Sequence, residues 1–178
     1  MKFLEKDLEE IIYETYKENR RKLCEKNLFI DGEMKRQLRI GNYGIADLVT
    51  IERDYNCETD YDYVLDEEKE TEDIILSENL EPKLVVTIYE LKKEKIGVSA
   101  FLQAINYAKG IKDYFDKRCF KFEVEIHIAL IGKELDTSGS FCFLPSVMSN
   151  LRFYTYEYGI DGIIFKREHG YQLTNKGF

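Results

Sequence analysis

The stretch KLVVTIYELKKEKIGVSAFLQAINYAKG, residues 83–110, decides the fold of this chain. Its first part, 83–91, is rich in β-branched and aromatic side chains, which is typical of a strand. From residue 98 to 117 apolar residues recur at helical spacing, which predicts an amphipathic helix. The strand nevertheless ends on Glu90 and Lys92, charged residues that a buried apolar face does not need. They are either solvated at the strand end or line a functional site.

The segments on either side of this stretch predict a mixed α/β (α+β) domain. We expect helix, strand, strand, strand, helix and strand, at residues 2–22, 34–41, 45–52, 83–91, 98–117 and 122–132. The tail predicts further short strands at 141–145, 151–159, 161–168 and 171–173. A chain of 178 residues suits one domain with a sizeable core, so we expect a single domain over 1–178 with a β-rich extension at about 133–178.

Composition excludes several classes of protein. A hydrophobic fraction of 44% with 34% charged residues excludes a disordered chain. Four scattered cysteines without a CxxC pair, and only two histidines, argue against a structural zinc site and suggest reduced thiols. The N-terminus has no continuous apolar stretch, and no apolar run approaches the roughly 20 residues that span a bilayer. We therefore expect a cytoplasmic protein with no membrane partner.

The net charge of −8 is distributed unevenly. Residues 54–81 hold twelve Asp or Glu against Lys69 alone, a local charge of −11, which leaves +3 on the rest of the chain. We interpret 54–81 as an acidic insertion in a mildly basic domain. A solvated loop is the simplest structure for it, and binding of a protein partner or mimicry of nucleic-acid charge are the alternatives. An insertion lying over a substrate cleft would repel DNA.

The strand at 83–91 and the strand at 45–52 together suggest a site. Because strand side chains alternate between faces, Glu90 and Lys92 share one face, and Asp47 can lie on the same face of a neighbouring strand. We expect the two strands to pair antiparallel, with Asp47 opposite Glu90 and the acidic insertion as an enlarged hairpin connection. The same register pairs two sets of apolar residues, Val49 with Ile88 and Ile51 with Val86.

Two neighbouring carboxylates and an ammonium group suit one kind of chemistry. Carboxylates that lie close together repel, and a proton or a divalent cation relieves the repulsion. Mg²⁺ typically takes one or two carboxylates and engages substrate phosphates. An ammonium group nearby can serve a water molecule and offset phosphate charge. These are the parts that hydrolysis of a phosphodiester requires.

Three motifs in this sequence resemble the PD-(D/E)XK nuclease superfamily. They are GNYGIADLVTI at 41–51, YELKK at 89–93, and QAINY at 103–107, which matches the QxxxY signature of the RecB-like branch. The resemblance covers about residues 1–131 and implies a restriction-endonuclease-like core, with α-β-β-β-α-β order around a mixed central sheet. Ala46 stands where the family name has proline. Asp47 and Glu90 are farther apart in sequence than is usual, and the acidic insertion accounts for the excess.

The resemblance also implies roles for individual residues. Mg²⁺ or Mn²⁺ would be held by Asp47, Glu90 and the Leu91 carbonyl, and Lys92 would serve the attacking water. Gln103 and Tyr107 would line the cleft. A glutamate of the first helix would be a further metal ligand, chosen as Glu9 with Glu5 and Glu10 as competitors. Weaker predictions are phosphate contacts at Arg39, Lys93 and Lys95. A half-exposed helix face is the alternative for Gln103 and Tyr107, and a solvated surface for Glu9 and the basic residues.

The sequence thus predicts a metal-dependent nuclease that hydrolyses DNA phosphodiester bonds through a metal-activated water. It would be an endonuclease or exonuclease acting in DNA repair, restriction or mobile-element defence. An RNA substrate and a homodimer stay open. The alternative function is a non-catalytic nucleic-acid-binding or protein-interaction module on the same fold.

Overall fold

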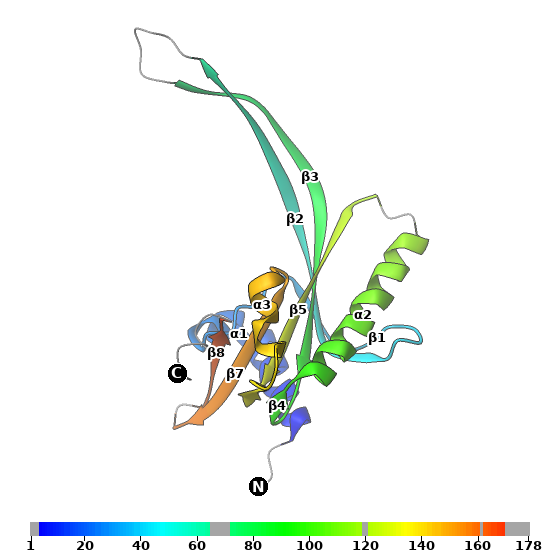
Figure 1. The fold of residues 1–178 in the computed structure, drawn as a ribbon, viewed down its shortest axis with the longest axis vertical. Helices are drawn as coiled ribbons and strands as arrows, with labels where there is room; N and C mark the ends of the chain where they lie inside the picture. The colour runs from blue at the N-terminus through cyan, green and yellow to red at the C-terminus, as the bar shows by residue number, and fades with distance from the viewer. Residues whose placement is uncertain (1–3, 65–71, 119–120, 161, 170–178) are drawn as a thin grey trace.

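The computed structural model describes residues 4–64, 72–118, 121–160 and 162–169, with side chains described outside 56–81. The chain is a mixed α/β fold around a six-stranded sheet (Figure 1). Its elements are α1 Glu5–Glu25, β1 Glu33–Arg39, β2 Ile45–Val64, β3 Glu72–Leu91, β4 Lys95–Ile96, α2 Val98–Lys117, β5 Glu123–Gly132, β6 Glu134–Leu135, the 3₁₀ turn η1 Phe141–Phe143, α3 Leu144–Val147, β7 Leu151–Gly159 and β8 Gly162–Glu168. Within the described ranges, no helix is long and apolar enough to cross a membrane.

The six strands lie in the order β1-β2-β3-β5-β7-β8, with β3, β5 and β7 parallel and the other pairs antiparallel. The two long helices, α1 and α2, cover opposite faces of the sheet, as the side chains of β3 show, because they alternate between these two faces. Tyr89 and Leu91 belong to the core cluster that α1 completes, whereas Val86 and Ile88 belong to the cluster that contains Tyr107 of α2. We call these sides of the sheet the α1 face and the α2 face.

The predicted elements of the first 132 residues all occur, in the predicted order. In the tail, the strands expected at 151–159 and 161–168 are β7 and β8, whereas the strand expected at 171–173 lies outside the described residues. The strand expected at 141–145 is wrong, because η1 and α3 occupy this region. Pro145 suits the first turn of a helix, and the helical turn lets Phe141 pack on Phe153 in the core.

The acidic insertion is not the solvated loop that its charge suggests. β2 and β3 continue through it as one antiparallel pair, whose paired residues run from Leu48 and Tyr89 out to Val64 and Glu72. Figure 1 shows this pair projecting from the body as a long ribbon, which we call the arm, residues 54–64 and 72–81. The ladder satisfies the backbone polar groups, and the tyrosines and β-branched residues of the segment favour extended structure.

A close contact sets the position of α2 against the turn between β1 and β2. A Cβ atom on Gly110 would lie 2.6 Å from side-chain atoms of both Ile40 and Tyr43. The Asn106 side chain donates to the Tyr43 carbonyl at 2.8 Å, and the Tyr43 hydroxyl donates to Asp113. This packing brings the middle of α2 beside the beginning of β2, where the predicted site residue Asp47 lies.

Candidate functional site

The pairing of β2 with β3 has the register that the sequence predicts. Val49 lies opposite Ile88 and Ile51 opposite Val86, and the ladder ends with Leu48 paired to Tyr89. One further step of this register sets Asp47 opposite Glu90. Residues opposite each other in an antiparallel pair project from the same face, so both carboxylates belong to the α2 face.

Glu90 is the most buried carboxylate of this region, with none of its surface exposed. Its Oε1 accepts a hydrogen bond from the Lys92 ammonium at 2.7 Å. Its Oε2 is buried and has no hydrogen-bond partner among the described residues. Burial raises the pKa of Glu90 to about 7, the Lys92 bond opposes the rise, and the charge of Asp47 adds to it.

Asp47 is half-buried at the start of β2. Its Oδ2 accepts a hydrogen bond from the Leu91 backbone N–H at 2.9 Å, which ties the carboxylate to the segment that carries Glu90. Burial raises the pKa of Asp47, the Leu91 bond opposes this effect, and the charge of Glu5 adds to it. Both predicted carboxylates therefore lie in surroundings that disfavour their ionised form.

Lys92 connects the sheet to the start of α1. Besides its bond to Glu90, its Nζ lies 3.8 Å from Oε1 of Glu5, whose Oε2 accepts a hydrogen bond from the Lys93 backbone at 3.3 Å. Burial lowers the pKa of Lys92, but the hydrogen bond with Glu90 and the charges of Glu90 and Glu5 outweigh it, so the pKa is raised. Lys92 is thus held as an ammonium ion between two carboxylates.

The two residues predicted on α2 contact each other. The Gln103 amide donates to the Tyr107 hydroxyl at 2.7 Å. Tyr107 is buried against Gly44, where an added Cβ would lie 2.9 Å from the ring and where the backbone φ is +119°. Burial raises the pKa of Tyr107, the Gln103 bond opposes this, and the charges of Glu90 and Asp47 add to it. The phenol therefore lies within electrostatic reach of both carboxylates.

A second part of the site is an open hollow between α1 and β1. It is lined by Glu5, Lys6, Glu9, Arg36, Gln37 and Asp47. Glu9 is buried, and its two oxygens accept hydrogen bonds from Arg36 and Gln37. Glu9 thus lines the same hollow as Asp47, but both of its oxygens are already engaged, whereas Glu5 contacts Lys92.

Two lining residues of this hollow, Lys6 and Gln37, were not predicted as site residues. Arg36 gives a weak signal in the sequence, as one of several basic residues before β2. Gln37 gives none, because its contact depends on a left-handed backbone, φ 50°, that interrupts β1. A non-glycine residue with this conformation is uncommon and is set by tertiary context.

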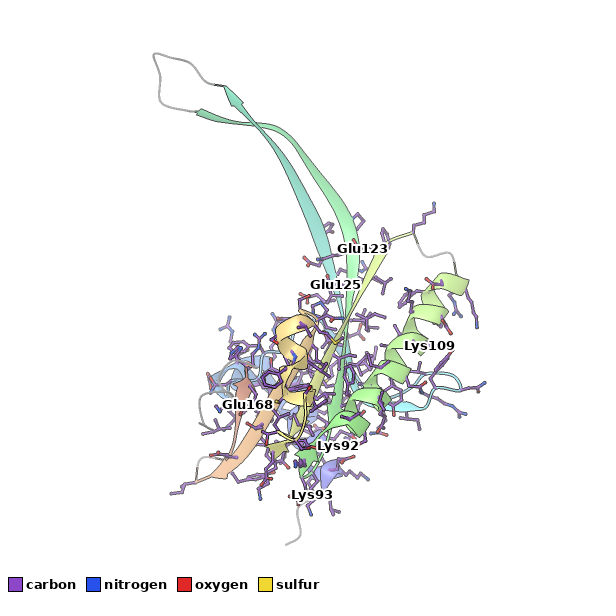
Figure 2. The ribbon with its side chains drawn as sticks, in the orientation of Figure 1. Lys92, Lys93, Lys109, Glu123, Glu125 and Glu168 are labelled. Atoms are coloured by element: carbon purple, nitrogen blue, oxygen red, sulfur yellow. The ribbon has the colours of Figure 1, made fainter. Side chains whose placement is uncertain are left out.

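The three weaker predictions lie outside the hollow. Arg39 is exposed at the end of β1. The Lys93 ammonium contacts Glu94 at 3.2 Å, and Lys95 contacts Asp136 at 3.0 Å. Figure 2 shows Lys93 near Lys92 at the end of the sheet opposite the arm. A phosphate contact of Lys93 or Lys95 would compete with its carboxylate partner.

The donors for a metal ion are few. Within the part of the chain that the structure describes, no group of three or more His, Cys, Asp or Glu side chains is placed to hold an ion. Two carboxylates and a carbonyl, those of Asp47, Glu90 and Leu91, are nevertheless a donor set that Mg²⁺ accepts, since this ion keeps several waters. The unpartnered Oε2 of Glu90 fits this set, because a buried carboxylate oxygen without a donor requires a proton or a cation.

Comparison of the chain with protein-family models, curated proteins and solved structures finds no match. The decisive local features are the buried Glu90, its neighbour Asp47 and the ammonium of Lys92.

Proposed function

We propose that this protein is a metal-dependent nuclease that hydrolyses DNA phosphodiester bonds, with a PD-(D/E)XK-type site. The observation that carries the proposal is the state of Glu90, which is fully buried beside Asp47, bonded to Lys92 through one oxygen and unpartnered at the other. A structural role alone gives no reason to bury a carboxylate with an unsatisfied oxygen.

In this proposal Asp47, Glu90 and the Leu91 carbonyl hold Mg²⁺ or Mn²⁺. A bound divalent cation lowers the pKa of a water molecule and offsets the charge on the phosphate. Lys92 carries three donor hydrogens, and one is directed to Glu90. The others can donate to a phosphate oxygen or orient the attacking water. Gln103 has a second amide hydrogen besides the one directed to Tyr107, and it can donate to the nucleic acid.

The charges around Lys92 favour dependence on a cation. Three carboxylates, those of Glu5, Asp47 and Glu90, surround this one ammonium group. A phosphodiester that approached the site without a cation would meet this negative charge directly. We therefore expect cleavage to require Mn²⁺ or Mg²⁺ and to stop when EDTA is added.

The test compares the wild-type protein with Lys92→Ala on end-labelled single-stranded, duplex and forked DNA, with Mn²⁺ or Mg²⁺. We expect the substitution to reduce cleavage by about 10²-fold or more, because it removes the group that serves the attacking water. Lys109→Ala, which removes an exposed lysine on the same chain, is the matched control and should cleave normally. Circular dichroism checks that both variants fold.

Absence of cleavage by the wild-type protein on all three substrates would overturn the proposal. A protein that bound DNA with the same affinity with and without metal would instead fit the alternative function, a non-catalytic binding module.

The arm offers a separate prediction. It leaves the body at the end of the sheet opposite Lys92 (Figure 2), and each strand residue advances about 3.4 Å, so residues beyond Cys57 lie roughly 30 Å or more along β2 from Asp47. Salt screens charges over about 8 Å at physiological ionic strength. We therefore expect replacement of residues 57–80 by Asn-Gly to change DNA affinity less than about 2-fold at that salt. A large gain in affinity, measured by fluorescence anisotropy, would show that the arm obstructs DNA.

A further inference from the structure

A row of charged side chains crosses the α1 face of the sheet, toward the arm and away from Lys92. Lys83 Nζ lies 3.4 Å from Asp54 and 3.2 Å from Glu125. His127 Nε2 lies 2.6 Å from Glu125, and Arg152 Nη2 lies 3.4 Å from His127 Nδ1. Each carboxylate of the row thus has a cationic or imidazole partner, and the row ends on the guanidinium of Arg152.

Arg152 is incompletely satisfied at this end. Its Nε is buried without a hydrogen-bond partner, and no carboxylate pairs with Arg152 within the described ranges. β8 lies next to it, with Arg167 opposite Tyr154. One further step of that register sets His169 opposite Arg152, at the spacing where side chains on one face touch. Arg167 in β8, the edge strand of the sheet, and His169 directly after this strand therefore lie two residues apart on one face. The guanidinium of Arg152 is directed to His127 of β5, on the other side of β7.

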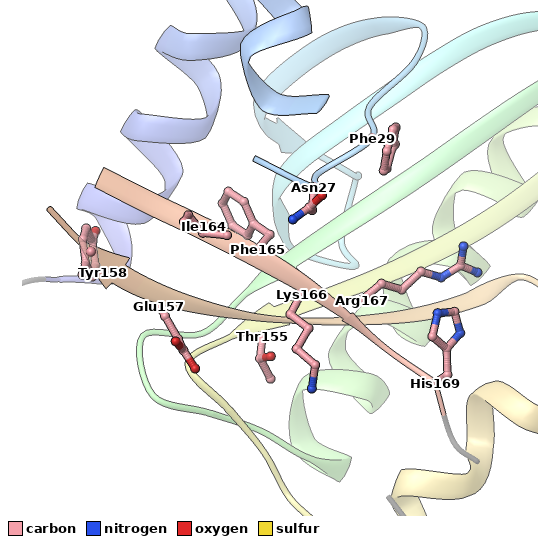
Figure 3. A pocket seen from close by; sticks show the side chains of 11 residues that line it. Asn27, Phe29, Thr155, Glu157, Tyr158, Ile164, Phe165, Lys166, Arg167 and His169 are labelled. Atoms are coloured by element: carbon pink, nitrogen blue, oxygen red, sulfur yellow. The ribbon is translucent and has the colours of Figure 1, made fainter. Parts of the chain in front are cut away.

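A hollow at the outer edge of β8 opens onto Arg167 and His169. Its lining includes Asn27, Phe29, Arg167 and His169 (Figure 3). Phe29 lies on the segment that joins α1 to β1, and 57% of its surface is exposed. The described residues provide no ion pair for Arg167 either. The hollow thus combines an exposed aromatic ring with Arg167, for which the described residues provide no ion pair, and its lining also includes Glu157 and Lys166.

We propose that this hollow binds a nucleotide, with its phosphate on Arg167 and His169 and its base against Phe29. Guanidinium groups match the geometry of phosphate oxygens and donate two hydrogen bonds at once. An exposed aromatic ring is a stacking platform for any base. The nucleotide can be free or part of a strand, since both present the same phosphate and base.

This site is separate from the proposed nuclease site. Tyr154, the partner of Arg167, belongs to the core cluster on the α1 face, whereas Asp47 and Glu90 project from the α2 face. Arg167 lies on β8, an edge strand of the sheet, and His169 directly follows it, whereas Asp47 and Glu90 lie on β2 and β3. The proposal therefore does not depend on the nuclease activity.

The test measures binding in EDTA, so that cleavage plays no part. The probes are a fluorescently labelled single-stranded DNA, AMP and inorganic phosphate, and the readouts are anisotropy and calorimetry. Two variants at exposed positions address the site, Arg167→Gln and Phe29→Ala. Lys109→Gln removes the same charge from α2 and controls for general electrostatics.

We expect Arg167→Gln to weaken binding about 10-fold, the effect of losing charge-assisted hydrogen bonds, and Phe29→Ala to weaken binding of AMP or DNA but not of phosphate. Lys109→Gln should bind as the wild type does. Binding of AMP assigns the site to free nucleotides, and binding of DNA without AMP assigns it to a strand. Equal losses of binding affinity in Arg167→Gln and Lys109→Gln, or no binding of any probe by the wild-type protein, would overturn the proposal.

Discussion

Replacing Glu90 with glutamine is expected to reduce metal-dependent cleavage by about 10³-fold while making the metal-free protein more stable above pH 7. The first effect follows from the loss of a carboxylate that would hold the cation. The second follows from burial, because the wild-type protein must place an ionised Glu90 in a fully buried position with one oxygen unpartnered. One substitution thus separates the proposed function of the carboxylate from its effect on folding.

The direction of the pH dependence follows from the pKa of Glu90. Burial raises it from 4.5 to about 7, so the folded protein binds the proton more tightly than the unfolded chain does. The resulting stabilisation is complete below pH 4.5 and is lost as the pH rises through about 7. A shift of this size corresponds to up to about 3 kcal/mol. Glutamine does not titrate, so this pH-dependent contribution to the free energy of unfolding is absent in the variant.

Thermal unfolding in EDTA at pH 5 and pH 8 measures the effect. We expect the difference in Tm between the variant and the wild type to be about 5 °C larger, in favour of the variant, at pH 8 than at pH 5. Glu134→Gln, which neutralises an exposed carboxylate, is the control and should show little change. A wild-type Tm that rises from pH 5 to pH 8 by as much as that of Glu90→Gln would contradict the assignment of Glu90 as a buried, destabilised carboxylate.

Replacing Arg36 with alanine is expected to destabilise the protein by about 3 kcal/mol, because it leaves the buried Glu9 without its cation. The Glu9 side chain is only 7% exposed, and Arg36 donates to one of its oxygens. The guanidinium also lies 5.5 Å from the centre of the Tyr13 ring, so the substitution removes a packing contact on α1 as well. Urea denaturation measures the loss.

A double-mutant cycle identifies the cause of this loss. Adding Glu9→Gln to Arg36→Ala removes the uncompensated charge and should restore a large part of the stability. Lys35→Ala breaks an exposed pair with Glu33 on the same strand and should cost less than about 1 kcal/mol. If Arg36→Ala cost no more than Lys35→Ala, the pair with Glu9 would be a surface contact of little consequence.

Local patterns in the sequence were sufficient to predict the order of the elements up to residue 132 and the pairing of two strands. The apolar spacing of 98–117 predicted α2, and the alternation around Asp47 and Glu90 predicted the register of β2 with β3. Both predictions are correct for the same physical reason. Burial selects one face of a helix or strand, and a slip of one residue would turn the apolar face to solvent.

Other features depend on contacts between residues far apart in the chain. The hydrogen bonds of Glu9 to Arg36 and Gln37, the close approach of Gly110 to Tyr43 and the helical turn at Phe141 have no periodic signature, because each depends on which distant atoms happen to be near. Charge density was a misleading guide to the arm, since backbone pairing and extended-strand preference act independently of net charge. The candidate carboxylates could thus be named from alternation alone, whereas their burial, partners and pKa values follow from packing.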